Sequence, residues 1–465
     1  MSAVKENDRM QGVLTILPEP REPRASHYAP RRDANRVTRL MATTMARPAV
    51  RHGSLSLFDQ AVVSGTSFVT SMIVGRLCSK EELGVFYLAL TVVYLARGIQ
   101  EQVVSAPYVI YHHRRRGEAL AMYSGSALLH YAGVTAVSLL MLLGLLGMLS
   151  IGIGPTGLAP VAWILMGALP LLLLREFIRR FTVAHLEMVA AIAIDASVAA
   201  IQLGGLLALA YYHKLTVTSA YITMGAACAI ACAGWFMAKR RPMRFSWSRA
   251  VADWRHNWGF GRWALMSHMV GSISPYLMPW FVIAARGKAE AGVLAACLSL
   301  AGVASMFVVG VATYLTPKAA LAFHSGGVDE LRRVLRVAAL VYAAVLGAFA
   351  LFVLATGDFL LVLAFGSKYA GYGGALGIMA ASMTALGMSI TAGNGLWAID
   401  RPKANFAADA TTLFTNLTVV LCLVQPLGVY GAALADLGGN IIGAAVRYAT
   451  LRRHLKTIRH ASETL

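Results

Sequence analysis

The stretch from Leu57 to Leu77 reads LFDQAVVSGTSFVTSMIVGRL, and its length and apolar character decide the class of fold. A helix rises about 1.5 Å per residue, so about 20 such residues cross the roughly 30 Å of hydrocarbon in a bilayer. Similar windows recur through the rest of the chain, and twelve of them are long enough to span. We predict transmembrane helices at residues 54–77, 84–110, 119–150, 158–182, 188–212, 216–238, 259–285, 291–315, 336–357, 372–397, 404–424 and 428–450.

The composition excludes a single water-soluble globular domain. The chain has 465 residues, of which 57% are hydrophobic and 14% are charged, whereas soluble domains carry about 25% charged residues. The formal net charge of +19 would suggest a nucleic-acid partner only if the basic residues gathered on one soluble face. They lie between apolar windows instead, so we expect no nucleic-acid partner.

The basic residues alternate between rich and poor loops, which gives the expected topology. With the amino terminus inside, the inner loops hold Arg114 to Arg116, Arg175, Arg179, Arg180, Lys239 to Arg255, Lys318, Arg332, Arg333, Arg336, Arg401, Lys403 and, at the carboxyl end, Arg447 to Arg459. The outer loops hold only Lys80, Lys214, Arg286, Lys288 and Lys368. Basic loops stay on the cytoplasmic side, so we expect both termini in the cytoplasm.

An internal repeat divides the chain into two halves. Lys80, Glu82, Gly84 and Val85 follow the first predicted helix, and Lys288, Glu290, Gly292 and Val293 follow the seventh with the same spacing. Two six-helix lobes related by an axis along the membrane normal would place a substrate cavity between them. We therefore expect a first lobe at residues 54–238, a basic cytoplasmic linker at 239–258, a second lobe at 259–451 and a tail at 452–465. Residues 1–53, rich in Lys, Arg and Pro, are predicted to form a disordered basic cytoplasmic arm.

The motifs LFDQAVVSGTSFVTSMIVGRL, KEELGVFYLAL and QEQVVSAP, between Leu57 and Pro107, together resemble the amino-terminal signature of bacterial polysaccharide transporters in the MOP flippase superfamily. Later segments, including GDFLLVLAFGSKY and WAIDRPK, match mainly in layout. The resemblance implies an all-α polytopic membrane protein with two six-helix lobes around a central cavity, as in MATE transporters. It also implies a flippase of the bacterial inner membrane that moves polyprenyl-pyrophosphate-linked oligosaccharides outward for exopolysaccharide, capsule or O-antigen synthesis. Membrane lipids and other polysaccharide-assembly proteins are the further partners expected.

Arg97 and Glu101 are the first candidates for the substrate site, because charges inside a membrane usually face a cavity or a partner. Arg97 falls near the middle of the second predicted helix, and the i, i+4 spacing lets Glu101 pair with it. One reading is a structural ion pair. The other is that the Arg97 guanidinium binds a pyrophosphate or an acidic sugar, because its fork of donors matches phosphate oxygens.

Further cavity candidates are Asp59 and Gln60 on the first predicted helix and Arg262 and His268 on the seventh. Asp59 would either pair with a cationic group or accept a proton that couples transport to a gradient; a capping role is the alternative. Arg262 lies near the inner surface, where binding a lipid phosphate is an equal possibility.

Secondary candidates are Arg76, expected to extend to the interface, Asp195, Asp409 and Asn394. Asp195 and Asp409 occupy similar places in the fifth and eleventh helices, and they would either form matching polar contacts between the lobes or bond within their own lobes. Asn394 suggests a loosened helix turn.

No metal site and no cofactor are expected, because Cys228 and Cys232 lack a second Cys or His pair. The sequence has no nucleotide-binding loop, no GxSxG and no HExxH, so we do not expect an enzyme. Three alternatives remain: a MATE-type ion-coupled exporter of organic cations, a membrane-embedded glycosyltransferase or ligase, and a scaffold for polysaccharide export. The short outer loops disfavour the enzyme.

Overall fold

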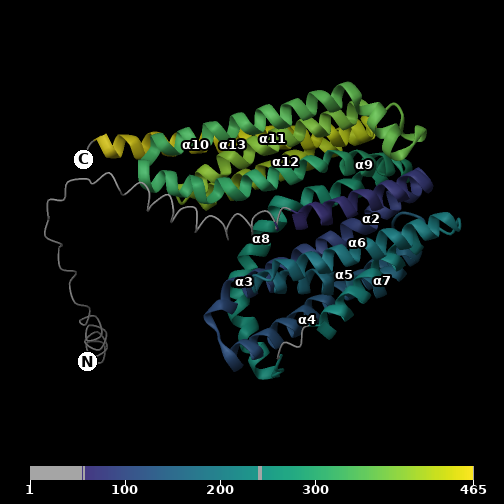
Figure 1. Ribbon diagram of the computed structural model, residues 1–465. Helices are drawn as coiled ribbons and strands as arrows, with labels where there is room; N and C mark the ends of the chain where they lie inside the picture. The colour runs from purple at the N-terminus through teal and green to yellow at the C-terminus, as the bar shows by residue number, and fades with distance from the viewer. Residues whose placement is uncertain (1–54, 56–57, 239–242, 464–465) are drawn as a thin grey trace, which may run out of the picture. The chain divides into compact units, whose positions relative to one another are not determined.

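The computed structural model describes residues 58–238 and 243–463, together with Leu55, and the helices of this part are drawn in Figure 1. The predicted basic arm at residues 1–53 lies outside the described residues. No strand occurs in the described ranges. The described part opens with a helix at residues 58–77. It continues through α2 Lys80–Gln100, a π-helix Glu101–Ser105, α3 Ala106–Tyr111, α4 Gly117–Ser150, α5 Leu158–Ala184, α6 Met188–Tyr211, α7 Val217–Ala238, α8 Trp247–Arg286, α9 Lys288–Ala301, α10 Val303–Phe365, α11 Gly373–Ala398, α12 Pro402–Leu427 and α13 Val429–Glu463.

These helices follow the predicted spans in order, which confirms the all-α polytopic fold. Nine of the described helices are long and apolar enough to cross a membrane by length and composition, as expected of a multi-pass membrane protein. A helix satisfies its own backbone hydrogen bonds, which the hydrocarbon cannot do. The eighth predicted helix, residues 291–315, corresponds to most of α9 and the start of α10. The ninth, residues 336–357, lies in the limb of α10 that follows Gly327, where a positive φ of 61° interrupts the helix.

Several predicted helix ends are wrong, including that of the last helix, since α13 continues to Glu463 rather than ending at residue 450. The ninth predicted helix ends at residue 357, but α10 continues to Phe365. Leu361 and Phe365 are fully buried in the core, so packing extends the helix beyond residue 357. The Asp358 carboxylate then accepts hydrogen bonds from the amides of Gly371 and Gly373 at 2.8 and 2.9 Å, next to the start of α11.

The seventh helix also begins earlier than residue 259. α8 starts at Trp247, so the last part of the predicted linker is helical. Its first turns pack on the first half of the chain: the His130 Nε2 lies 2.8 Å from the Ala250 carbonyl oxygen, and Arg115 donates to Asp253 at 2.8 Å. Tyr123 donates to Asn257 at 3.0 Å. These contacts attach α8 to α4 and to the residues just before α4, ahead of the part of α8 that was predicted to span.

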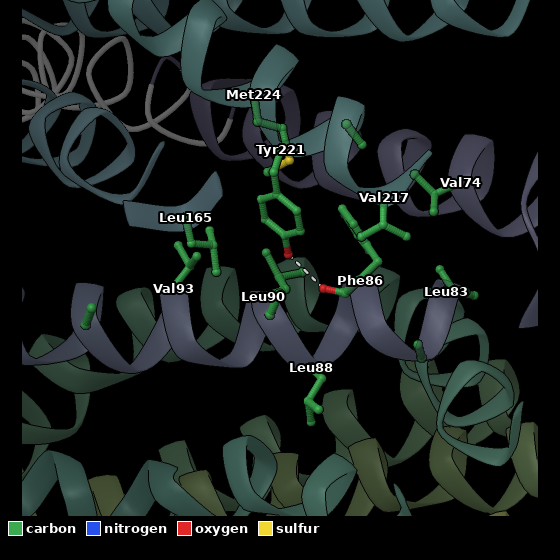
Figure 2. Close-up of a cluster of buried hydrophobic side chains, with 14 of the residues drawn as sticks. Val74, Leu83, Phe86, Leu88, Leu90, Val93, Leu165, Val217, Tyr221 and Met224 are labelled. Atoms are coloured by element: carbon green, nitrogen blue, oxygen red, sulfur yellow. Dashed lines mark hydrogen bonds between the residues drawn. The ribbon is translucent and has the colours of Figure 1, made fainter. Parts of the chain in front are cut away.

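Packing in the first half centres on α2, α5 and α7. Figure 2 shows the ring of Tyr221, on α7, among Phe86, Leu90 and Met224, with its hydroxyl directed at the Phe86 carbonyl. This hydroxyl donates to that carbonyl at 2.7 Å, and Tyr221 is fully buried. A buried tyrosine needs such a partner for its polar end. In the second half α10 packs on α11, and α13 packs on α11 and α12.

The repeated motif marks the contact between the two halves. Lys80 and Lys288 are the first residues of α2 and α9, and these two helices pack together. Ser79 and Glu82 cap α2 reciprocally: the Glu82 amide donates to the Ser79 hydroxyl at 3.1 Å, and the Ser79 amide donates to the Glu82 carboxylate at 2.9 Å. Glu290 is used differently, because its carboxylate accepts from the Val429 amide at the start of α13 at 3.0 Å.

Candidate functional site

A cluster of arginines and carboxylates lies inside the first half of the chain, and α5 supplies most of it. Arg175 and Arg179 are one turn apart on α5, so both reach the same neighbour, Asp195 on α6. Arg179 Nε lies 2.7 Å from Asp195, and its Nη2 lies 2.6 Å from Asp59 on the first helix. Arg175 also donates to Asp195. Arg179 therefore joins three helices through two charge-assisted hydrogen bonds.

Glu176 is the most surrounded carboxylate of the cluster. Its side chain is 3% exposed, and guanidinium nitrogens approach it from Arg180 at 3.2 Å, Arg179 at 3.5 Å, Arg175 at 3.6 Å and Arg97 at 4.0 Å. An isolated buried carboxylate is strongly unfavourable, so this charge requires the surrounding arginines.

Arg97 is held more loosely than the arginines of α5. Its side chain is 37% exposed, and its shortest ion pair is the 4.0 Å approach to Glu176. The guanidinium also lies 5.8 Å from the centre of the Tyr94 ring. Arg179, in contrast, is 11% exposed and forms two short ion pairs. Arg97 is therefore accessible while it remains attached to the cluster.

Arg97 and Glu101 do not form the ion pair that their spacing allows, and Glu101 pairs with Arg180 instead. Glu101 begins the π-helix, in which the Ala106 amide bonds the Glu101 carbonyl instead of the carbonyl four residues back. The Glu101 amide still bonds the Arg97 carbonyl, so the wider turn shifts only the residues that follow Glu101. Glu101 lies 2.5 Å from Arg180, with both side chains about one third exposed at 28% and 34%. The local spacing in the sequence did not reveal this change.

A cavity of about 100 Å³ opens beside the cluster. Its lining is mixed: apolar side chains such as Phe86, Leu90 and Met224 make up much of it, and the polar groups come from Thr70, Arg97, Glu176, Asp195 and Gln202, among others. Such a volume exceeds what one water requires, and the polar lining offers hydrogen-bond partners. The site can therefore be hydrated next to the buried charges.

His268 on α8 approaches this region from the other half of the chain. A side-chain carbon added at Gly98 would lie 2.5 Å from His268 Nε2, so the imidazole packs directly on the α2 backbone beside Arg97. Its Nδ1 lies 3.5 Å from the Ser272 hydroxyl, and Nε2 has no hydrogen-bond partner among the described residues. The Tyr276 ring lies 6.4 Å from that of Tyr94. These side chains bring α2 and α8 together near Arg97.

The other predicted residues lie elsewhere. Gln60 donates to Ser64 at 3.2 Å within its own helix, and the exposed Arg262 guanidinium lies 5.6 Å from the Trp263 ring. Arg76 donates to the Leu363 carbonyl at 2.5 Å, so it links the first helix to α10. Asn394 accepts from Thr316 at 2.6 Å.

Asp195 and Asp409 each bond within their own half of the chain. Asp409 on α12 pairs with Arg447 on α13, which also donates to Ser389 on α11. Both halves thus contain an arginine–aspartate pair in a similar place, but the second half has a single arginine where the first has two.

Sequence reasoning missed Glu176, and it missed that the neighbouring arginines form buried ion pairs. Arg175, Arg179, Arg180 and Arg447 were interpreted as loop charges that set topology. The usable signal was their spacing: residues 175, 176, 179 and 180 form i, i+3 and i+4 pairs within a predicted spanning helix. In the described part of the chain, no group of three His, Cys, Asp or Glu residues could hold a metal ion.

The fold is that of MOP superfamily transporters. The chain is similar to an inward-facing multidrug resistance MATE family transporter, with a TM-score of 0.71 and 15% identity over 87% of this chain and 96% of that one. It is also similar to the lipid II flippase MurJ, with a TM-score of 0.68 and 13% identity over 87% of each chain. A MOP superfamily transporter from Pyrococcus furiosus, described as having a binding pocket of reverse polarity, gives a TM-score of 0.63 and 14% identity over 88% of this chain and 96% of that one. No protein-family model and no curated protein matches the sequence.

Proposed function

We propose, starting from a fold shared with MOP superfamily transporters, that the protein is a flippase for a lipid-linked oligosaccharide. Its substrate is a polyprenyl-pyrophosphate-linked repeat unit of an exopolysaccharide, capsule or O-antigen. It works by alternating access in the bacterial inner membrane, with both termini in the cytoplasm. The headgroup enters between the two lobes while the polyprenyl tail stays in the bilayer.

The observation that supports an anionic substrate is that, within the cluster, Arg97 is more exposed than most of the carboxylates. Three of the four carboxylates are enclosed: the side chains of Asp59, Glu176 and Asp195 are 8%, 3% and 0% exposed, and each lies against arginine. The fourth, Glu101, is 28% exposed and pairs with Arg180 at 2.5 Å. Arg97 is 37% exposed and only weakly engaged. A pyrophosphate can therefore reach a guanidinium without first breaking a short ion pair, and guanidinium binds phosphate oxygens in a bidentate manner.

The same asymmetry disfavours an exporter of organic cations. To bind Asp59 or Asp195, such a substrate would have to displace Arg179 across separations of 2.6 and 2.7 Å. Breaking a buried pair leaves an uncompensated charge and costs about 3–5 kcal/mol. The description of the Pyrococcus furiosus transporter connects a difference in pocket polarity with a different function within this fold. Pocket polarity is therefore a reasonable guide to substrate charge here.

The test is the fate of lipid-linked oligosaccharide in a strain that lacks the gene. We expect intact linked units to accumulate in the inner leaflet while surface polymer disappears, and the wild-type gene to reverse both effects. Normal surface polymer with a loss of resistance to cationic drugs would reject the flippase and support the exporter. Accumulated units that lack their last sugar would instead indicate a transferase.

A further inference from the structure

A second cavity lies far from the arginine–carboxylate cluster along the chain, between the two limbs of α10. It has a volume of about 540 Å³. Residues 310–318 of the limb before Gly327 and residues 330–341 of the limb after it line this groove. The residues recur at three- and four-residue intervals, so each limb presents one face to the groove.

One end of the groove is charged, and it is the end nearer to the Gly327 turn. Lys318, Glu330 and Arg333 lie there, and the Lys318 ammonium sits 5.4 Å from the centre of the Tyr314 ring. Glu330 pairs with Arg333 at 3.0 Å, but these side chains are 37% and 77% exposed. An exposed pair of this kind is weak, so Arg333 can exchange Glu330 for another anion.

The rest of the groove is apolar. Gly310, Val311, Val334, Val337 and Val341 line it with small or branched side chains. At about 1.5 Å per residue, the faces from 318 back to 310 and from 333 on to 341 extend about 12 Å away from the charged end. Val337 and Val341 are exposed at 56% and 39%, so a neighbouring molecule can cover them.

The topology places the charged end at the membrane surface. Arg332, Arg333 and Arg336 lie in the first turns of the second limb of α10, in a basic segment that the topology predicted from the sequence places on the cytoplasmic side. The charged end then lies at headgroup depth, and the apolar end points into the hydrocarbon. The cationic end of the groove complements a phosphate headgroup, and the apolar end complements an acyl chain.

We propose that this groove of α10 is a binding site for an anionic phospholipid of the cytoplasmic leaflet. Lys318 and Arg333 bind the headgroup phosphate, and one acyl chain lies along Val311, Val337 and Val341. A zwitterionic lipid fits less well, because its own cationic group would lie against Lys318 and Arg333. The site is separate from the substrate cavity and does not rest on the proposed transport function.

The experiment uses purified full-length protein in lipid nanodiscs and phosphatidylglycerol with a photoactivatable group in one acyl chain. After illumination we expect labelled peptides within residues 310–341. An interfacial cationic residue contributes about fivefold to binding of anionic lipid, so Lys318→Gln with Arg333→Gln should reduce labelling by about tenfold or more. Glu330→Gln should increase labelling severalfold, because it releases Arg333.

Two neighbouring variants are matched controls. Arg336→Gln removes a positive charge, and Asp329→Asn removes a negative one, both from the same limb of α10 and outside the groove lining. Each should leave labelling within twofold of the wild type. If the charge variants fail to fold, Val337→Trp fills the apolar channel and keeps both cations, and it should also abolish labelling.

Three results would overturn the proposal. The first is equal labelling by phosphatidylcholine with the same photoactivatable chain, which would make the contact independent of headgroup charge. The second is unchanged labelling of correctly folded Lys318→Gln, Arg333→Gln protein. The third is displacement of the probe by polyprenyl phosphate but not by unlabelled phosphatidylglycerol, which would assign the groove to a polyprenyl tail.

Discussion

Gly84 and Gly292 meet across the contact between α2 and α9, and each exposes its backbone to the other helix. A side-chain carbon at Gly84 would lie 2.2 Å from the Lys288 carbonyl oxygen, and one at Gly292 would lie 1.9 Å from the Lys80 carbonyl oxygen. The contact is reciprocal, so the two copies of the repeated motif pack against each other. Glycine is needed here because no other residue lets two helices approach this closely.

Alanine at either glycine should therefore force the two helices apart. We expect Gly84→Ala and Gly292→Ala to destabilise the protein by about 1–3 kcal/mol each, as overpacking does, and to lower the unfolding temperature measured in detergent. Gly65→Ala is the matched control, because nothing lies within 4 Å of the added carbon. It should be neutral or slightly stabilising, since alanine favours a helix. Equal unfolding temperatures for all three variants would contradict the close approach.

Removing the charge of Arg97 should impair transport without unfolding the protein. A hydrogen bond to a charged group contributes about 1.5–3 kcal/mol, so Arg97→Gln should weaken apparent substrate affinity roughly tenfold to hundredfold. Arg97→Lys should recover part of it, because it restores charge but not the planar fork. The measurement is flipping of lipid-linked oligosaccharide in reconstituted vesicles.

Variants of two further arginines serve as comparisons for the transport defect of Arg97→Gln. Arg262→Gln should have a smaller effect, because that guanidinium is exposed beside Trp263. The exposed Arg452 on α13 serves as a control for charge alone, and Arg452→Gln should transport normally. Full transport by Arg97→Gln would remove Arg97 from the substrate site.

Arg179 should be the structural centre of the cluster. Arg179→Met leaves Asp59 and Asp195 with one short ion pair fewer each, and removing one partner of a buried pair costs about 3–5 kcal/mol. Adding Asp59→Asn and Asp195→Asn should recover part of the lost stability, since no unpaired charge then remains. The readout is the unfolding temperature of the purified protein.

A comparison with a surface pair tests the role of burial. Arg333→Gln breaks the exposed pair with Glu330 and should cost less than about 1 kcal/mol. Should Arg179→Met prove as mild as Arg333→Gln, the cluster would not depend on Arg179.

Cys78 lies between the first helix and α2, outside the spanning segments, and burial raises the pKa of its thiol from 9.0 to about 11; nearby Glu82 adds to the shift. Only the thiolate reacts with maleimides. With the other cysteines replaced, labelling at Cys78 should be slow at pH 8 and rise about tenfold per pH unit up to pH 10. Because the folded state retains the proton, its stability should fall as pH rises from 9.0 towards about 11.

The control is the same variant in denaturant, where labelling at pH 8 should be much faster. A membrane-impermeant reagent applied to intact cells also tests the topology, because Cys78 is expected on the outer side. Rapid labelling of the folded protein at pH 8 would show that the thiol is not buried.

Hydrophobicity predicts helices better than it predicts their ends. The windows around residues 57–77 and 119–150 correspond to observed helices, because crossing a bilayer requires a long apolar run. The ends of α8 and α10 differ from the prediction for a tertiary reason. Residues 247–258 are polar enough to resemble a loop, yet Asp253 and Asn257 are buried against α4. Residues 358–365 lengthen α10 because Leu361 and Phe365 enter the core.

The sequence by itself determined the fold class, the order of the helices and the repeated motif, because these depend on composition, apolar length and spacing along one chain. It also identified Arg97, Asp59 and Asp195, inside the predicted helices, as candidate site residues. Only the tertiary structure decided which charges meet. Arg179 on α5 joins Asp59 and Asp195 on two other helices, and Glu101 pairs with Arg180 on α5 rather than with Arg97. Pairing of buried charges depends on the rotation and contact of helices distant in sequence, which local spacing does not specify.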